Sequence, residues 1–143
     1  MKQKDKELLI KDLCNRLPYG VICHYNCIIP CDRRLIEKTN ASDALKGIIP
    51  MPDGHISFII GIDKVNVIEG DIKPYLRSMD SMTDEERKEY NEYLFHGASI
   101  GLMSNTETAY ELIDWLNKKM FDYRGLIPMN LALEAPAGMY KIE

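Results

Sequence analysis

The chain begins with a helical pattern of hydrophobic residues. Leu9, Leu13 and Leu17 recur at a spacing of four, which is typical of the apolar face of an amphipathic helix. A charged pair directly after the first three apolar residues interrupts the hydrophobic stretch, whereas a secretory signal has an uninterrupted apolar segment. The pattern therefore predicts a helix over residues 4–17 that ends at Pro18 and belongs to the folded domain.

The next part of the chain has strand-like patterns. VICHYNCII (21–29) is rich in β-favouring residues and alternates only loosely, which predicts a strand buried on both faces. Pro30 is expected to end this strand or to place the residues after it at a sheet edge. Residues 32–39 are short and mixed and are interpreted as a second strand, and the polar stretch 40–47 is interpreted as a connection.

The most strand-like segment of the chain is HISFIIGID (55–63). It follows a Pro-Asp-Gly sequence at 52–54 that favours a turn. A second turn at residues 63–64 would pair it with VNVIEG (65–70) as a hairpin. Together these segments predict a mainly antiparallel sheet from about residue 20 to 70.

A helix is predicted to start after the sheet. Thr83 and Glu86 have the spacing of a capping box, in which each residue bonds the backbone amide of the other. The helix is expected over residues 84–95, with a stop near Gly97. Its inward side chains are predicted to be Tyr90, Tyr93, Leu94 and Phe95.

A second helix is predicted over residues 106–120, with Ser104 or Thr106 as its N-cap. Trp115 is expected on its flank. Its apolar stripe is predicted to comprise Tyr110, Ile113, Leu116 and Met120. The sequence thus predicts an α+β fold in one domain, residues 1–143: an N-terminal helix, then a mainly antiparallel sheet, then two helices (about 84–95 and 106–120) packed on it.

Length and composition limit the class of protein. The 143 residues are 45% hydrophobic and 28% charged, which is typical of a globular domain with its own core. Acidic residues outnumber lysine and arginine by 22 to 18, and the net charge of -4 argues against the broad basic surface used in non-specific nucleic-acid binding. No apolar run approaches the ~20 residues that a membrane-spanning helix needs. We therefore expect neither a membrane nor a nucleic acid as the partner.

Three segments carry a family resemblance: KDLCNRLPYGV (11–21), DIKPYLRSMDSMTDEE (71–86), and FDYRGLI with LALEAPAGMY (within 121–140). They resemble a family of small uncharacterised proteins of Bacteroides-type gut bacteria, often encoded on phages or other mobile elements. The match covers both ends and the middle of the chain, and the segment 23–70 departs from it. The resemblance implies a bacterial, cytoplasmic protein from a family without an established activity, and it provides no site residues.

The densest group of potential metal-binding or redox residues is Cys23, His24, Cys27 and Cys31. Zinc sites often use C-x2-C pairs, but here the spacing is C-x3-C-x3-C. Along a strand, every fourth residue is about 13 Å further on, which is too far for shared ligation of one ion. We therefore interpret the cysteines as reduced packing residues of a cytoplasmic protein, with no metal and no cofactor. The alternative is a thiol- or metal-dependent enzyme built on these four residues.

The segment DIKPYLRSM (71–79) suggests a binding surface. In an extended conformation its polar residues project to one side and its apolar residues to the other. The FDYRG turn could extend this surface to a patch of aromatic and cationic side chains, which suits a peptide, a carboxylate or phosphate, or an RNA base. The patch comprises Lys73, Tyr75, Arg77, Tyr123 and Arg124. The alternative is that both tyrosines are half-buried and that the two arginines hold the acidic helix start at 84–86.

These patterns favour a protein that works by contact. The sequence contains no recognisable catalytic arrangement, no calcium loop and no phosphate-binding glycine motif. Eight tyrosines against three phenylalanines favour amphipathic contact surfaces. The leading hypothesis is a non-enzymatic protein-interaction domain that binds a protein partner or itself, as an accessory protein of a mobile element. The alternatives are the thiol- or metal-dependent enzyme and a nucleic-acid-binding accessory protein that uses basic residues at 73–77 and 123–124.

Overall fold

The computed structural model describes residues 2–31, 34–52, 56–61, 63–65, 72–99 and 106–140. Within these ranges, only the backbone is described at 27–31, 34–38, 63–65, 96–99 and 106–108. Among the described residues, no helix combines the length and the apolar character that crossing a membrane requires.

The N-terminal helix forms where the leucine spacing predicts it. Helix α1 (Gln3–Arg16) buries Leu9 and Leu13 in the main core. The 3₁₀ turn η1 (Leu17–Tyr19) comes next, and the proline at its start prevents α1 from continuing. Gly20 then reverses the chain with a φ of 73°, a left-handed conformation that glycine adopts without a steric penalty.

Six strands form one sheet. They are β1 (Ile22–Cys31), β2 (Arg34–Pro50), β3 (Ile56–Ile60), β4 (Asp63–Val65), β5 (Ile72–Leu76) and β6 (Leu133–Glu134). Their order is β4-β3-β2-β1-β5-β6, and all neighbours are antiparallel except β5 and β6. The predicted α+β class is confirmed, with an N-terminal helix, a mainly antiparallel sheet and two later helices. The last two strands extend the sheet beyond residue 70.

The predicted connection at 40–47 is wrong, because β2 runs through it. Residues 41–44 pair with β1, and the Leu45 N–H donates to the Val21 carbonyl over 2.8 Å. The register shifts beside Asn26, whose Oδ1 accepts the N–H of Asn40 over 2.8 Å. Asn40 itself has a φ of 54°. The polarity of this stretch therefore belongs to a β-bulge and to a strand with one solvent-facing side.

Three further predictions within the sheet need correction. Pro30 does not end β1, because it pairs with Leu35 of β2 and the strand continues. Over residues 21–26, buried and half-buried positions alternate, so this part of β1 is not buried on both faces. The chain turns at Gly61 (φ 62°), and residues 63–64 already belong to β4. Residues 53–54 of the first predicted turn and 66–70 of the last predicted strand lie outside the described part.

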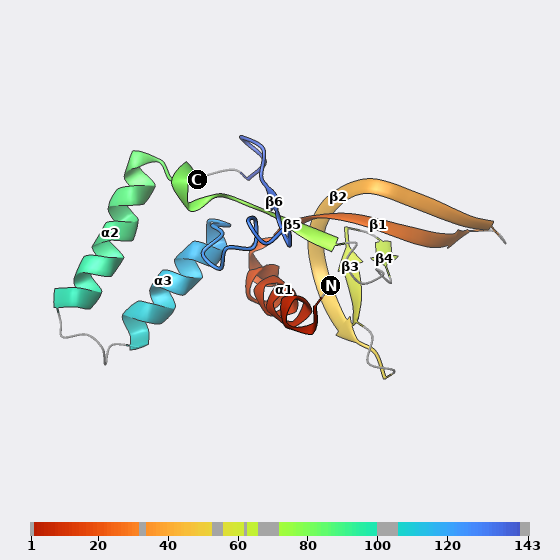
Figure 1. The fold of residues 1–143 in the computed structure, drawn as a ribbon, viewed down its shortest axis with the longest axis horizontal. Coiled ribbons are helices and arrows are strands. Elements are labelled where there is room, and N and C mark those ends of the chain that lie inside the picture. Colours follow the sequence, from red (N-terminus) through yellow and green to blue (C-terminus); the bar gives the residue numbers. More distant parts are fainter. Residues whose placement is uncertain are drawn as a thin grey trace.

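Two antiparallel helices form a hairpin after the sheet (Figure 1). The 3₁₀ turn η2 (Met79–Ser81) leads into α2 (Asp84–Ser99), which packs on α3 (Thr106–Lys118). The capping box is confirmed: Glu86 N–H donates to Thr83 Oγ1 over 3.1 Å, and Thr83 N–H donates to Glu86 Oε1 over 3.0 Å. Helix α2 ends at Ser99, two residues after the predicted stop near Gly97. Ser104, one of the two predicted caps of the next helix, lies outside the described residues.

The predicted inward faces of the two helices are confirmed for Tyr90, Tyr93, Leu116 and Met120, which are buried or half-buried, and are wrong for the other four residues. Phe95 and Tyr110 are 75% and 69% exposed, and Leu94 and Ile113 are 47% and 37% exposed. Trp115, predicted on the flank, is buried instead. The reason is that each helix packs mainly on the other around this indole, whereas the prediction placed both helices on the sheet.

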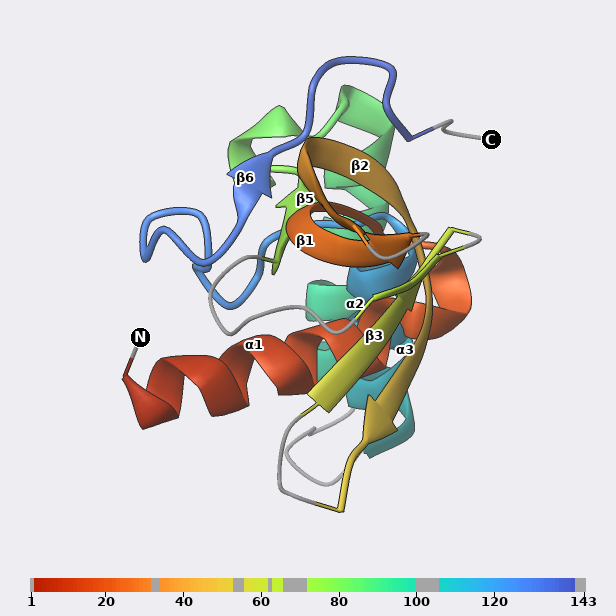
Figure 2. The ribbon, with the colours of Figure 1, turned by 90° about the vertical axis from the view of Figure 1, so that its right-hand side faces the viewer.

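The hydrophobic residues form two separate clusters. In the main core, α1 lies across one face of the sheet and packs on side chains from β1, β2, β3 and β5 (Figures 1 and 2). In the hairpin, Trp115 stacks on Tyr90 and Phe121, with ring centroids 6.4 and 5.7 Å away, and also contacts Tyr93. An isolated bridge between Arg77 and Phe121 joins the end of β5 to the chain after α3. The hairpin is therefore attached to the sheet through a short backbone connection.

Candidate interaction surfaces

Strand β5 presents the alternation that the sequence predicted. Ile72, Pro74 and Leu76 are buried, whereas Lys73 and Tyr75 between them are half-buried. The two polar side chains thus share the face of the sheet opposite to the main core. The other three candidate residues take part in two intramolecular networks.

Arg77 binds the start of α2. Its guanidinium donates two hydrogen bonds to the Glu86 carboxylate, over 2.8 and 2.7 Å. It also lies 4.3 Å from the centre of the Phe121 ring. These hydrogen bonds lower the pKa of Glu86 to about 2, against the opposing effect of burial. The position of Arg77 agrees with the alternative interpretation, in which this arginine holds the acidic helix start.

Tyr123 and Arg124 belong to the second network, which reaches α1. Arg124 Nε donates to Asp12 Oδ1 over 3.2 Å, and its Nη2 donates to the Tyr123 hydroxyl over 3.1 Å. That hydroxyl donates to Asn117 Oδ1 of α3 over 2.9 Å. Arg124 therefore holds α1 rather than the acidic start of α2.

The centre of this network is an ion pair inside the fold that the sequence analysis missed. Asp12 and Arg16, one turn apart on α1, are both fully buried and approach to 2.8 Å. Arg16 Nη2 also donates to the Phe121 carbonyl over 2.7 Å, and Nη1 has no hydrogen-bond partner among the described residues. The signal available in the sequence was an Asp and an Arg at i, i+4, a spacing that usually indicates an exposed pair.

Cys23 and His24 point to opposite faces of β1. The Cys23 side chain is buried in the main core, whereas His24 is half-buried on the other side. Burial, reinforced by the Asp12 carboxylate, raises the pKa of Cys23 to about 12, which keeps the thiol protonated at neutral pH. The side chains of Cys27 and Cys31 lie outside the described part. Among the described residues, no three His, Cys, Asp or Glu side chains come together as metal ligands.

The burial of Cys23 leads to a testable difference in thiol reactivity. A variant that retains only Cys23, with the other three cysteines replaced by serine, is expected to resist a thiol reagent at pH 8 until the protein is unfolded. A variant that retains only the exposed Cys14 is expected to react at once and serves as the control. Spectrophotometric titration with a chromogenic disulfide measures both rates. Fast labelling of native Cys23 would contradict the assignment of this thiol to the core.

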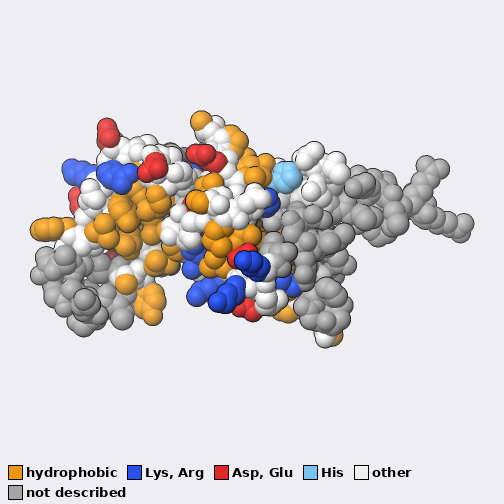
Figure 3. Space-filling view, in the orientation of Figure 1, with side chains coloured by type: hydrophobic (Ala, Val, Ile, Leu, Met, Phe, Trp, Pro, Cys, Tyr) orange, Lys and Arg blue, Asp and Glu red, His pale blue; other side chains and the backbone are white. Residues whose placement is uncertain are grey.

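The helical hairpin carries most of the exposed large hydrophobic residues of the described chain. Four of the six large hydrophobic residues exposed there lie on it: Leu94, Phe95, Tyr110 and Ile113. Leu94 and Phe95 come from the last two turns of α2, and Tyr110 and Ile113 come from the first half and the middle of α3. Hydrophobic side chains also gather over the hairpin in the space-filling view (Figure 3).

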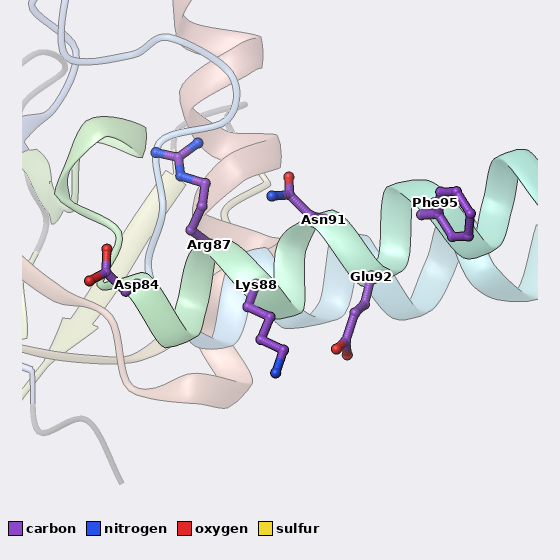
Figure 4. Close-up of a pocket in the computed structure, with 6 residues that line it drawn as sticks. All are labelled: Asp84, Arg87, Lys88, Asn91, Glu92 and Phe95. Carbon is purple, nitrogen blue, oxygen red and sulfur yellow. The ribbon is translucent and has the colours of Figure 1, made fainter.

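The hairpin is also the acidic part of the chain. Its two helices contain eight acidic residues and three lysines or arginines, which leaves 14 acidic against 15 basic residues in the remainder. A shallow groove of about 540 Å³ runs along α2, with α3 behind the helix in the view of Figure 4. It is lined by Asp84, Arg87, Lys88, Asn91, Glu92 and Phe95. The groove is thus lined by polar and charged residues along most of its length and ends at the exposed ring of Phe95.

A second groove, of about 420 Å³, lies between the start of α2 and residues 134–140. Two hydroxyl groups that line it are used within the fold: Ser78 Oγ accepts the Asp80 N–H, and Thr83 Oγ1 accepts the Glu86 N–H. The Tyr140 hydroxyl donates to the Tyr75 carbonyl over 2.7 Å. We therefore attribute this groove to the packing of the C-terminal segment against β5 and the start of α2.

No family model, no curated protein and no solved structure matches the chain. The resemblance to proteins of mobile elements and the bacterial, cytoplasmic assignment therefore stay predictions.

Proposed function

We propose that the protein is a non-enzymatic protein-interaction domain that binds a partner protein through the α2–α3 hairpin. The supporting observation is the exposure of four large hydrophobic residues on the hairpin: Leu94, Phe95, Tyr110 and Ile113. Exposed large apolar side chains are frequent at contact sites, and aromatic residues are frequent among those that dominate binding energy. In this proposal the domain acts as an accessory protein of a mobile element.

The charge of the hairpin indicates what kind of partner it suits. With eight acidic residues against three basic ones, two hairpins would repel each other if they met face to face. A partner that presents apolar side chains flanked by lysine or arginine would instead match both the aromatic and the acidic groups. The proposal is therefore a different protein with a basic, apolar binding segment, in preference to self-association through the hairpin.

The thiol- or metal-dependent enzyme receives less support from the geometry. Of its four residues, Cys23 is buried with a raised pKa, and His24 projects from the opposite face of the strand. A nucleophilic thiol needs a lowered pKa and access to substrate.

Replacement of Phe95 by serine is expected to weaken binding of the partner by about 30-fold or more, the effect of losing an interface residue that contributes about 2 kcal/mol. The partner is first isolated by affinity capture on the wild-type protein, and its affinity for each purified variant is then measured by calorimetry. Tyr19→Ser, which removes an exposed aromatic ring outside the hairpin, is the matched control and is expected to bind like the wild type.

Equal affinities of the Phe95→Ser protein and the wild type would place the interface elsewhere. A loss of affinity of the same size in the Tyr19→Ser control would contradict a defined interface on the hairpin. It would show that the variants lose structure or that binding is non-specific hydrophobic association. Increasing salt is expected to weaken wild-type binding, because the interaction includes opposite charges near the surface.

A further inference from the structure

The face of the sheet opposite to α1 carries a row of polar side chains. His24 of β1 pairs with Ser42 of β2 on one side and with Lys73 of β5 on the other. Directly opposed residues of antiparallel strands have Cβ atoms about 5 Å apart, so these three side chains lie side by side across three strands. Ser42 is exposed, and the other two are half-buried.

Two aromatic rings on this face are held in a fixed arrangement. Tyr75 lies two positions after Lys73 and therefore projects to the same side. Its ring centroid lies 6.4 Å from that of His24, and the two ring planes are nearly perpendicular, at 81°. The Tyr75 hydroxyl lies 3.4 Å from Ser42 Oγ. The two rings thus form an aromatic pair on a half-exposed sheet surface.

Two carboxamides border the rings and the lysine. His24 Nε2 and Asn40 Oδ1 are 3.2 Å apart, and Lys73 Nζ donates to Asn130 Oδ1 over 3.0 Å. Asn130 has a φ of 61°, a left-handed conformation that asparagine tolerates better than most residues. Groups that donate and accept hydrogen bonds therefore surround the aromatic pair.

The charge of this face differs from that of the whole chain. The contact described for Lys73 is to a neutral amide, and none of the described cross-strand neighbours of His24 on this face carries a carboxylate. The excess of acidic residues is located on the hairpin, and the rest of the chain is close to neutral. The net charge of -4 therefore does not weigh against an anionic ligand at this surface.

We propose that this sheet face binds single-stranded nucleic acid. Unpaired bases stack on Tyr75 and His24, Lys73 binds a backbone phosphate, and the carboxamides of Asn40 and Asn130 form hydrogen bonds with base edges. A duplex does not fit, because its bases are stacked on each other and cannot lie on the rings. The inference is independent of the protein-interaction proposal, since it concerns a different surface of the molecule.

Fluorescence anisotropy with labelled RNA and DNA strands of about ten nucleotides tests the proposal, a length within the about 4–16 nucleotides that small single-strand-binding domains such as OB folds contact. The wild-type protein is expected to bind the single strands, and unlabelled duplex of the same sequence is expected not to compete. Tyr75→Ala is expected to lower the affinity by roughly 5- to 100-fold, whereas Tyr75→Phe retains the ring and is expected to retain binding.

Lys73→Gln is expected to reduce the slope of the logarithm of the binding constant against the logarithm of the salt concentration by about one, the value for the loss of one phosphate contact. Lys11→Gln is the matched control, because it removes the same charge from the exposed side of α1, beyond the opposite face of the sheet. Circular dichroism confirms that each variant is folded, and His24→Ala tests the aromatic pair if Tyr75→Ala does not fold. The absence of binding by the wild type at low salt would overturn the proposal, as would equal losses in the two lysine variants.

Discussion

Asp12→Asn is expected to destabilise the fold by about 3 to 5 kcal/mol, the usual cost of breaking an ion pair inside a protein. The substitution keeps the shape of the side chain and removes only its charge. Arg16 would then keep a fully buried guanidinium without its counter-charge, and Arg124 would lose its partner as well. The other described contacts of the Arg16 guanidinium are the Phe121 carbonyl and the Tyr123 ring, whose centre lies 5.2 Å from the central guanidinium carbon, and neither carries a counter-charge.

Chemical denaturation followed by Trp115 fluorescence and by circular dichroism measures this effect. Glu7→Gln changes an exposed carboxylate on the same helix and is expected to alter the free energy of unfolding by less than about 0.5 kcal/mol. Adding Arg16→Met to Asp12→Asn is expected to recover part of the loss, since the uncompensated charge is then absent. Additive effects of the two substitutions would show that the residues do not stabilise the fold as a pair.

The ion pair also explains how the hairpin is held relative to α1. Asp12 and Arg16 lie on α1, whereas their partners Phe121 and Arg124 lie in the segment after α3. Tyr123 continues the network to Asn117, the penultimate residue of α3. Weakening this network is therefore expected to affect the orientation of the hairpin as well as the stability of the main core.

Local patterns predicted those elements whose ends are determined by nearby residues. The leucine spacing and Pro18 define α1, and Thr83 with Glu86 defines the start of α2. In both cases the stabilising contacts lie within a few residues along the chain. Such contacts depend little on the rest of the fold, which is why the sequence alone reveals them.

Elements that depend on distant contacts were predicted less well. The stretch 40–47 is polar and resembles a loop, but pairing with β1 makes it a strand. The inward face of each hairpin helix is determined by the other helix, so the periodicity of one helix could not show that Trp115 is central and Phe95 is exposed. The tertiary partner decides the outcome in both cases.

The candidate surfaces were partly predictable for the same reason. Alternation along β5 placed Lys73 and Tyr75 on one side of the strand, as the structure shows. It could not show that His24 and Ser42 lie beside them, because that neighbourhood depends on the strand order. Nor could it show that Arg77 and Arg124 are bound to carboxylates on two different helices.

The salt bridge between Arg77 and Glu86 is expected to make the protein sensitive to acid. The pKa of Glu86 is lowered from 4.5 to about 2, chiefly by the hydrogen bonds from Arg77. A carboxylate with a lowered pKa in the folded state stabilises the fold above its unfolded pKa, and this contribution is lost as the pH falls from about 4.5 towards 2. After allowance for screening near the surface, the contribution at neutral pH is about 2 kcal/mol.

Glu86→Gln tests this contribution because glutamine can still complete the capping box, so that only the charge is removed. The variant is expected to be about 2 kcal/mol less stable than the wild type at pH 7, and the two proteins are expected to converge as the pH approaches 2. Denaturant titrations at several pH values measure the difference. Glu85→Gln is the control: this exposed neighbour should lose at most a few tenths of a kcal/mol at every pH, through the helix dipole. A constant difference between Glu86→Gln and the wild type from pH 7 to 2 would contradict the charge-based explanation and would attribute the effect of Glu86 to packing alone.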